Sequence, residues 1–240
     1  MLHFVGPSAR EKSSAAPGPG GITVLSLDRF FSPADHAAIE AAVREVEAQS
    51  AGEIVPYAVE RSDHYVDALW HAATLGALLG ALAGAIVHWI GEFWGGPTVL
   101  WIALPPTAGA ALGWLAALAI PALRRALVAR DVLAARVRQR AAQAFLDEGI
   151  FRTRDRTGIL IFVSLFERQV VVRADRGLDG VVTPGEWEQI VAAIAAGMRR
   201  GQPGPALGEG IRRCATLASR LPRRPDDRDE LSGQLRLERQ

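Results

Sequence analysis

The sequence predicts an α/β domain that is interrupted by a two-helix transmembrane hairpin. Two observations support this class. Segments typical of strands and amphipathic helices lie on both sides of two long uncharged segments, and neither side alone holds enough strands to form a core. The two uncharged segments are joined by a short loop, GEFWGGP, as expected for a chain that crosses a membrane and returns. The economical arrangement is one domain whose sheet takes strands from both sides of the insertion.

The composition argues against nucleic-acid binding and excludes an intrachain disulfide and a cysteine-based zinc site. The chain has 240 residues, a formal net charge of +1 and a single cysteine, Cys214. A charge this close to zero gives no field for nucleic acid, which we do not expect as a partner. One cysteine allows neither an intrachain disulfide nor a cysteine-based zinc site. The apolar run at Met1–Phe4 is too short for a signal peptide, and residues 6–21 are polar and rich in Pro and Gly, so we expect residues 1–21 to be a disordered N-terminus.

The segment before the insertion predicts one helix and one strand. Ser32 is placed as an N-cap, Pro33 fits the first helical position, and Asp35 lies near the acidic position of a capping box. Apolar residues then recur at helical spacing until Gly52, which is expected to end the helix. Residues 53–60 are expected to form a strand, whose pattern is given by Ile54, Val55, Tyr57 and Val59.

The insertion, residues 67–123, contains both expected spans. Leu69–Ile90 and roughly residues 98–121 carry no Asp, Glu, Lys or Arg. About 20 residues are enough to cross a hydrocarbon core of about 30 Å. The alternative, a helical hairpin buried in a soluble core, is disfavoured because a domain this small cannot cover two uniformly apolar helices. Tryptophans fall near the expected membrane interfaces: Trp70, Trp89, Trp94 and Trp101.

The charges around the spans predict their orientation. Arg124 and Arg125 follow the second span directly, and the loop between the spans has no basic residue. By the positive-inside rule both termini are cytoplasmic and the loop is external, in a bacterial inner membrane. The expected partners are therefore the lipid bilayer and other membrane proteins. Pro105-Pro106 leaves open whether the second helix is kinked at this point or begins there.

Small residues recur every four positions in both spans. They allow two helix backbones to approach closely. We expect them to join the two helices of the hairpin, and homodimerisation is the less favoured use. The glycines concerned are Gly76, Gly80 and Gly84 in the first span and Gly109 and Gly113 in the second.

The segment after the insertion predicts a helix, a β-hairpin and two further helices. The first helix ends at Gly149, and GILIFVSL, FER and QVVVRAD read as strand, turn and strand. Thr183 and Glu186 form a second capping box, and Cys214 lies on the apolar face of the last helix as an inert thiol. Residues 22–66 and 124–221 together are the expected discontinuous domain, followed by a disordered charged tail at 222–240.

Three stretches of the sequence resemble the TPM-domain family. They are FSPADHAAIEAAVREVEAQSAGEIVPYAVE, AAQAFLDEGIFRTRDRTGILIFVSLFERQVVVRADRGLDG and TPGEWEQI, and the second is the most specific. More closely, the chain resembles a bacterial membrane-protein branch with transmembrane helices inside the domain. The resemblance implies an α/β/α layered domain. It also implies several functions, because relatives are described as phosphatases, divalent-metal binders and assembly or repair factors for membrane complexes.

The candidate site is a set of three acids near the ends of the expected β-hairpin: Asp155, Asp175 and Asp179. The start of one antiparallel strand lies beside the end of the next, so we expect Asp155 and Asp175 to be neighbours. Converging carboxylates would suit Ca²⁺ or Mg²⁺, and the family's acidic cleft, as the resemblance implies, falls at these positions. The alternative is that the acids form turns and pair with neighbouring arginines.

The sequence leaves two functions open. The preferred one is a binding, assembly or scaffold role of a cytoplasmic TPM-like domain held at the membrane. The alternative is a divalent-metal-dependent phosphohydrolase that uses the three acids. No nucleophile motif, phosphate loop or nucleotide-binding glycine motif is present in the sequence, so no catalytic residue is assigned.

Overall fold

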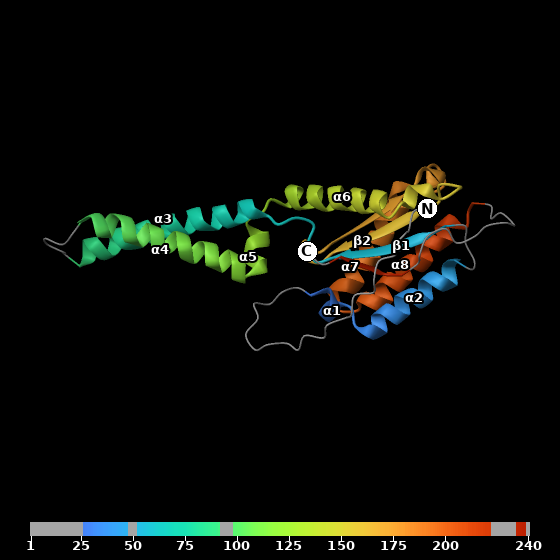
Figure 1. Ribbon diagram of the computed structural model, residues 1–240, viewed down its shortest axis with the longest axis horizontal. Coiled ribbons are helices and arrows are strands. Elements are labelled where there is room, and N and C mark those ends of the chain that lie inside the picture. Colours follow the sequence, from blue (N-terminus) through green and yellow to red (C-terminus); the bar gives the residue numbers. More distant parts are fainter. Residues whose placement is uncertain (1–25, 48–51, 92–97, 222–233, 239–240) are drawn as a thin grey trace, which may run out of the picture.

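The computed structural model describes residues 26–47, 52–91, 98–221 and 234–238. Four strands form one mixed sheet in the order β3-β2-β1-β4: β1 Ile54–Val59, β2 Ile159–Ser164, β3 Gln169–Ala174 and β4 Arg236–Glu238. Figure 1 shows α6 on one face of this sheet and α2, α7 and α8 on the other. The helices of this region are α1 Leu27–Phe30, α2 Pro33–Glu47, α6 Arg130–Asp147, α7 Pro184–Arg199 and α8 Pro203–Ala218, with short 3-10 turns η1 Ile150–Arg152 and η2 Arg176–Leu178. The predicted α/β/α layering is confirmed.

The sheet joins the two parts of the chain that flank the insertion. β1 pairs with β2 in parallel, with Ile54 opposite Ile159, and β2 pairs with β3 as an antiparallel hairpin. Because β1 precedes the insertion and β2 follows it, neither part contains the sheet alone. The strand pairing is therefore in line with the prediction that residues 67–123 interrupt a single domain.

Apolar side chains on the two faces of the sheet form two separate cores. On one face Ile54, Ile159 and Ile161 pack with residues of α1, α2, α7 and α8. On the other face Leu160 and Phe162 pack against α6. All six residues of β1, IVPYAV, are buried. The reason is that helices cover both faces, so that even the tyrosine of this strand is enclosed.

The C-terminal tail differs from the expectation. We predicted disorder throughout residues 222–240, but Arg236–Glu238 forms β4, which pairs in parallel with β1. Side chains hold this short strand in place. Tyr57 donates a hydrogen bond of 2.9 Å to Glu238, and Arg140 of α6 forms an ion pair with the same carboxylate. The rest of the tail and residues 1–21 lie outside the described residues.

The two apolar segments form a helical hairpin that projects away from the sheet (Figure 1). It consists of α3 Val66–Ile90 and α4 Thr98–Ala119, and α5 Pro121–Ala126 follows. Both helices are long and apolar enough to cross a membrane, and only 6% of each span is buried. This exposure contradicts the alternative of a hairpin enclosed in a soluble core. Pro105 and Pro106 lie inside α4, so the helix does not begin there.

Both predicted capping boxes are present. The Ser32 amide donates to Asp35 Oδ2 at 2.9 Å, and the Asp35 amide donates to Ser32 Oγ at 3.2 Å. The Ser32 hydroxyl, together with backbone amides, lowers the pKa of the Asp35 carboxyl. At the start of α7 the box between Thr183 and Glu186 is complete. These boxes fix where α2 and α7 begin.

Candidate functional site

Asp175 occupies a structural position at the end of β3. The residue is 7% exposed, and its Oδ1 accepts a hydrogen bond of 2.8 Å from the amide of Arg176 at the start of η2. Its Oδ2 lies 3.5 Å from Nη1 of Arg156. The carboxylate thus caps a turn and faces an arginine, which is the alternative that the sequence left open for it.

The other two acids differ from Asp175 in their exposure to solvent. The loop of residues 155–156 does lie beside the turn after β3, since the amide of Gly177 donates to the carbonyl of Arg156 at 2.9 Å. However, Asp155 and Asp179 are exposed whereas Asp175 is buried. Within the part of the chain that is described, no group of three or more His, Cys, Asp or Glu residues has a geometry that could hold a metal ion.

A buried carboxylate that the sequence did not indicate lies in the turn of the β2–β3 hairpin. Glu167, in the turn between β2 and β3, is 5% exposed. It accepts hydrogen bonds from the Tyr65 hydroxyl at 2.6 Å, from the Ser62 amide at 2.9 Å and from the Ser164 hydroxyl. Burial, followed by the hydrogen bond to Glu167, raises the pKa of the Tyr65 phenol. The only sequence signal was an acid between two apolar strands, which is ordinary for a turn.

The hydrogen bonds of Glu167 connect the start of the helical hairpin, α3 and α4, to the sheet domain. Tyr65 directly precedes α3, and Ser62 lies between β1 and α3, whereas Glu167 and Ser164 belong to the β2–β3 hairpin. Tyr65 also stacks on Phe166 with ring centroids 5.3 Å apart. With both oxygens of Glu167 bonded to donors, the group has the character of a structural anchor rather than a catalytic base.

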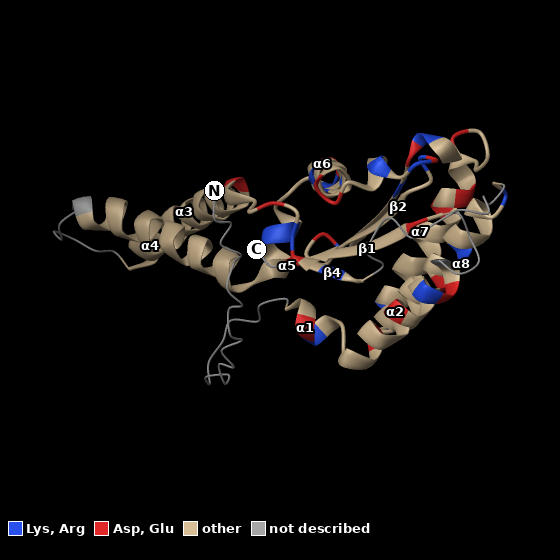
Figure 2. Cartoon of the chain, turned by 45° about the vertical axis from the view of Figure 1, so that its right-hand side comes forward, with Lys and Arg blue, Asp and Glu red and all other residues tan. Residues whose placement is uncertain are grey.

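The segment that follows the second span contacts the same turn. The guanidinium of Arg124 lies 5.6 Å from the centre of the Phe166 ring, and Arg125 Nη1 donates to the Phe166 carbonyl at 3.4 Å. Figure 2 shows the basic residues of α5 where the apolar hairpin meets the sheet domain. Burial, and then the positive charge of Arg61, lowers the pKa of Arg124. The Nε of Arg124 is buried and has no hydrogen-bond partner among the described residues.

The predicted helix-packing and interface residues are distributed along the hairpin. A Cβ on Gly76 or Gly80 would overlap the backbone of α4, and one on Gly84 would meet the Pro105 ring. Gly109 and Gly113 likewise face the backbone of α3. The glycine stripes therefore meet each other within one chain. Trp70 and Trp89 lie near opposite ends of α3 and are 61% and 82% exposed, Trp101 lies near the start of α4, and Trp94 falls outside the described residues.

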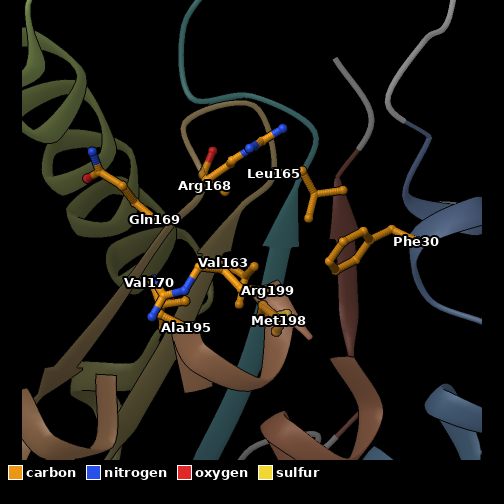
Figure 3. A pocket seen from close by; sticks show the side chains of 10 residues that line it. Phe30, Val163, Leu165, Arg168, Gln169, Val170, Ala195, Met198 and Arg199 are labelled. Atoms are coloured by element: carbon orange, nitrogen blue, oxygen red, sulfur yellow. The ribbon is translucent and has the colours of Figure 1, made fainter. Parts of the chain in front are cut away.

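A pocket of about 340 Å³ opens beside the β2–β3 turn. Figure 3 shows its lining, which comes from α1, β2, β3, α7 and the turn. Its walls are largely apolar, with Phe30, Leu165 and Met198 among them. Two arginines, Arg168 and Arg199, supply the charged groups of the lining. Sequence reasoning did not find this pocket, because its residues are brought together only by the packing of α1 and α7 against the sheet.

Cys214 is not a candidate nucleophile. It is fully buried in α8, and burial raises the pKa of its thiol to about 12. A thiol of this pKa is almost entirely protonated near neutral pH, and only the thiolate reacts. The expectation of an inert core cysteine is in line with this environment.

Comparison with known proteins agrees with the fold. The family model described as TPM domain matches residues 125–217. No curated protein matches the chain. Among solved structures, the chain is similar to the NMR structure of BA42 protein from the psychrophilic bacterium Bizionia argentinensis, with a TM-score of 0.54 and 17% sequence identity. The alignment covers 89% of this chain and 99% of that one, and at this identity the likeness is one of fold.

Proposed function

Because the chain carries a TPM domain over residues 125–217, completed by β1 from before the hairpin, we propose that it is an integral membrane protein that presents this domain at the cytoplasmic face of a bacterial inner membrane. Its role there is binding, assembly or scaffolding through contacts with other membrane proteins. The proposal includes membership of the branch of the family whose transmembrane helices lie inside the domain.

The observation that carries the proposal is the exposure of the hairpin. Large apolar side chains point outward along both helices, for example Leu78, Leu82 and Leu104, which are 64%, 58% and 64% exposed. Apolar surface on this scale is unfavourable in water, and an apolar patch of this size on a soluble protein would cause association. A bilayer is the environment that makes two such helices stable side by side.

The orientation follows from the arginines at the base of the hairpin. Reporter fusions at Ser13 and Ser232 are expected to give a cytoplasmic signal, and a tag inserted between Gly95 and Gly96 is expected to be accessible from outside. The reason is that Arg124 and Arg125 disfavour translocation of the end that carries the domain. Two reporter enzymes are fused in turn at each position. One is active only in the cytoplasm, and the other is active only after export. An external signal from either terminus would contradict the proposed orientation.

A binding role is favoured over the phosphohydrolase alternative by what surrounds the candidate acids. Asp175 is used for a turn and an ion pair, and the buried Glu167 has its donors in place. Neither arrangement leaves a carboxylate ready to hold a metal or to accept a proton from water. The Ca²⁺ or Mg²⁺ site therefore stays a prediction without geometric support among the described residues.

The effect of Asp175→Asn separates the two uses of this carboxylate. As a cap and ion-pair partner, Asp175 stabilises the turn after β3, so the substitution is expected to lower the stability of the cation-free protein by about 1 kcal/mol. Thermal unfolding of the full chain in detergent measures this, with and without millimolar Ca²⁺ or Mg²⁺. Asp179→Asn, at an exposed position nearby, is the matched control and is expected to change little.

The opposite result would support the metal site. Carboxylates that converge on an empty cation site repel one another, so removing one of them would raise the melting temperature of the cation-free protein. A cation would then stabilise the unmodified chain, and Asp175→Asn would abolish that response. These two results together would favour the phosphohydrolase over the binding role.

A further inference from the structure

The pocket beside the β2–β3 turn combines two chemical features that one ligand must satisfy. Its walls are apolar side chains from α1, α7 and the turn, namely Phe30, Leu165 and Met198. Its charged groups are Arg168 and Arg199, both exposed on the surface (Figure 3). Neither arginine forms an ion pair with another residue of the described part of the chain, although most arginines of α6 and α8 do have acidic partners. A ligand with one anionic group and one apolar part fits this lining.

More positive charge stands next to the pocket. Arg125 of α5 contacts the β2–β3 turn through the Phe166 carbonyl, two residues before Arg168. Burial, followed by the positive charge of Arg168, lowers the pKa of Arg125, so the two guanidinium groups repel each other in the absence of an anion. An anion bound at Arg168 relieves this repulsion. Arg199 adds a third positive charge at the last turn of α7, where the helix dipole favours it.

The position of the pocket identifies the source of the ligand. β1 and β2 are parallel and both end toward the hairpin, and the turn after β2 packs against α5, which directly follows the second span. The pocket therefore opens at the end of the domain from which the hairpin leaves. If the hairpin spans a bilayer, as proposed above, this end faces the headgroups of the cytoplasmic leaflet. Anionic lipids are enriched there and attract basic residues close to the membrane.

We propose that this pocket binds an anionic phospholipid of the cytoplasmic leaflet. The phosphate group is bound by the arginines of the lining, Arg168 and Arg199, and the glycerol end of one acyl chain follows the apolar wall formed by Phe30, Leu165 and Met198. A volume of about 340 Å³ is at the lower end for a ligand pocket, so the pocket takes this part of the lipid while the remaining chain stays in the leaflet. The proposal rests on the membrane location proposed for the hairpin. A bound lipid would hold the domain at a fixed orientation to the membrane.

The test compares lipid retention by the purified full chain. The chain in nonionic detergent is incubated with equal amounts of phosphatidylglycerol and phosphatidylcholine of identical acyl chains, and bound lipid is counted by native mass spectrometry. Phosphatidylglycerol is expected to be retained preferentially. The double variant Arg168→Gln, Arg199→Gln is expected to bind it about thirtyfold more weakly, since each basic residue near an anionic lipid contributes a factor of about five.

A matched control removes the same charge elsewhere. Arg138 on α6 and Arg176 in η2 are exposed and do not line the pocket. The double variant Arg138→Gln, Arg176→Gln is expected to retain phosphatidylglycerol like the unmodified chain. Equal retention of the two lipids by the unmodified chain, or equal loss in the two double variants, would overturn the proposal. All four substitutions are on the surface, and thermal unfolding verifies that each variant is folded.

Further measurements identify other occupants of the pocket. They also distinguish a failure of the lipid proposal from a failure of the proposed membrane location. Millimolar inorganic phosphate is expected to leave the lipid bound, because it offers nothing to the apolar wall, and displacement by phosphate would instead indicate a site for soluble anions. Dimers that form in place of lipid binding would indicate that a second copy of the chain occupies the pocket.

Carbonate extraction of native membranes tests whether the helical hairpin is integrated in the membrane. An extracted chain would refute membrane integration, whereas an integrated chain without lipid preference would refute only the lipid site.

Discussion

Replacing residues 70–121 by a short flexible linker is expected to give a soluble protein that unfolds cooperatively. The two ends that the linker must join lie close to each other, because Leu127 after the cut packs against the apolar clusters that contain Ala68 and Leu69 before it. Doubling the length of a flexible loop costs only about 0.6 kcal/mol, so the linker adds little to the free energy of the folded state. The exposed apolar surface of α3 and α4 is removed at the same time.

The fragment of residues 124–240, expressed alone, is expected not to fold. It lacks β1, which pairs with both β2 and β4, and it lacks α2, which packs with α8 in the larger of the two cores. The loss therefore amounts to the whole stability of the domain, about 5–15 kcal/mol for a domain of ordinary stability. Circular dichroism during heating measures both proteins. A sharp transition of the fragment by itself would show that β1 and α2 are dispensable.

The linker-fused protein must keep the tail to be stable. A version that ends at Leu221 loses β4, together with the contacts of Glu238 to Tyr57 and Arg140. Without Glu238, the guanidinium of Arg140 loses its nearest carboxylate. The side chain of Arg140 is only 11% exposed. This comparison gives the tail a measurable structural role, which its composition did not suggest.

Local patterns in the sequence were sufficient for most elements of the fold. Capping boxes at Ser32 and Thr183 placed the starts of α2 and α7, because such a box depends on residues only three positions apart. The run GILIFVSL predicted a strand covered on both faces, and β2 is buried throughout. The apolar hairpin was equally clear, because two uncharged segments of about 20 residues joined by a short loop are typical of paired membrane spans.

The parts that sequence reasoning missed depend on long-range contacts. β4 has only three residues, two of them charged, and it forms because the edge of β1 is available and Arg140 and Glu148 pair with its charged side chains. The candidate acids look alike in the sequence, but Asp175 is buried under the turn that it caps while Asp155 is exposed. Burial of a single carboxylate is decided by tertiary packing, which no local pattern records.

The substitution Gly76→Leu is expected to open the apolar hairpin of α3 and α4 while leaving the sheet domain folded. A Cβ at this position would overlap the carbonyl oxygen of Gly109, would lie 2.9 Å from its carbonyl carbon, and would lie 3.2 Å from the Cα of Gly113. These are backbone atoms of α4, so no side-chain rotation relieves the clash, and the helices must separate. Overpacking of this kind costs about 3 kcal/mol or more.

The hairpin carries its own spectroscopic probe for this experiment. Trp70 of α3 and Trp114 of α4 pack edge to face with ring centroids 4.9 Å apart, so near-ultraviolet circular dichroism of the full chain in detergent reports whether the helices are together. Gly76→Leu is expected to abolish this tryptophan signal and to lower the melting temperature of the hairpin. The control Ala83→Leu adds a larger side chain to α3 at an exposed position and is expected to preserve both. If both variants keep the signal, the glycine stripes do not hold the two helices together. If Gly76→Leu instead dissociates a dimer and leaves the tryptophan contact intact, the stripes act between two chains.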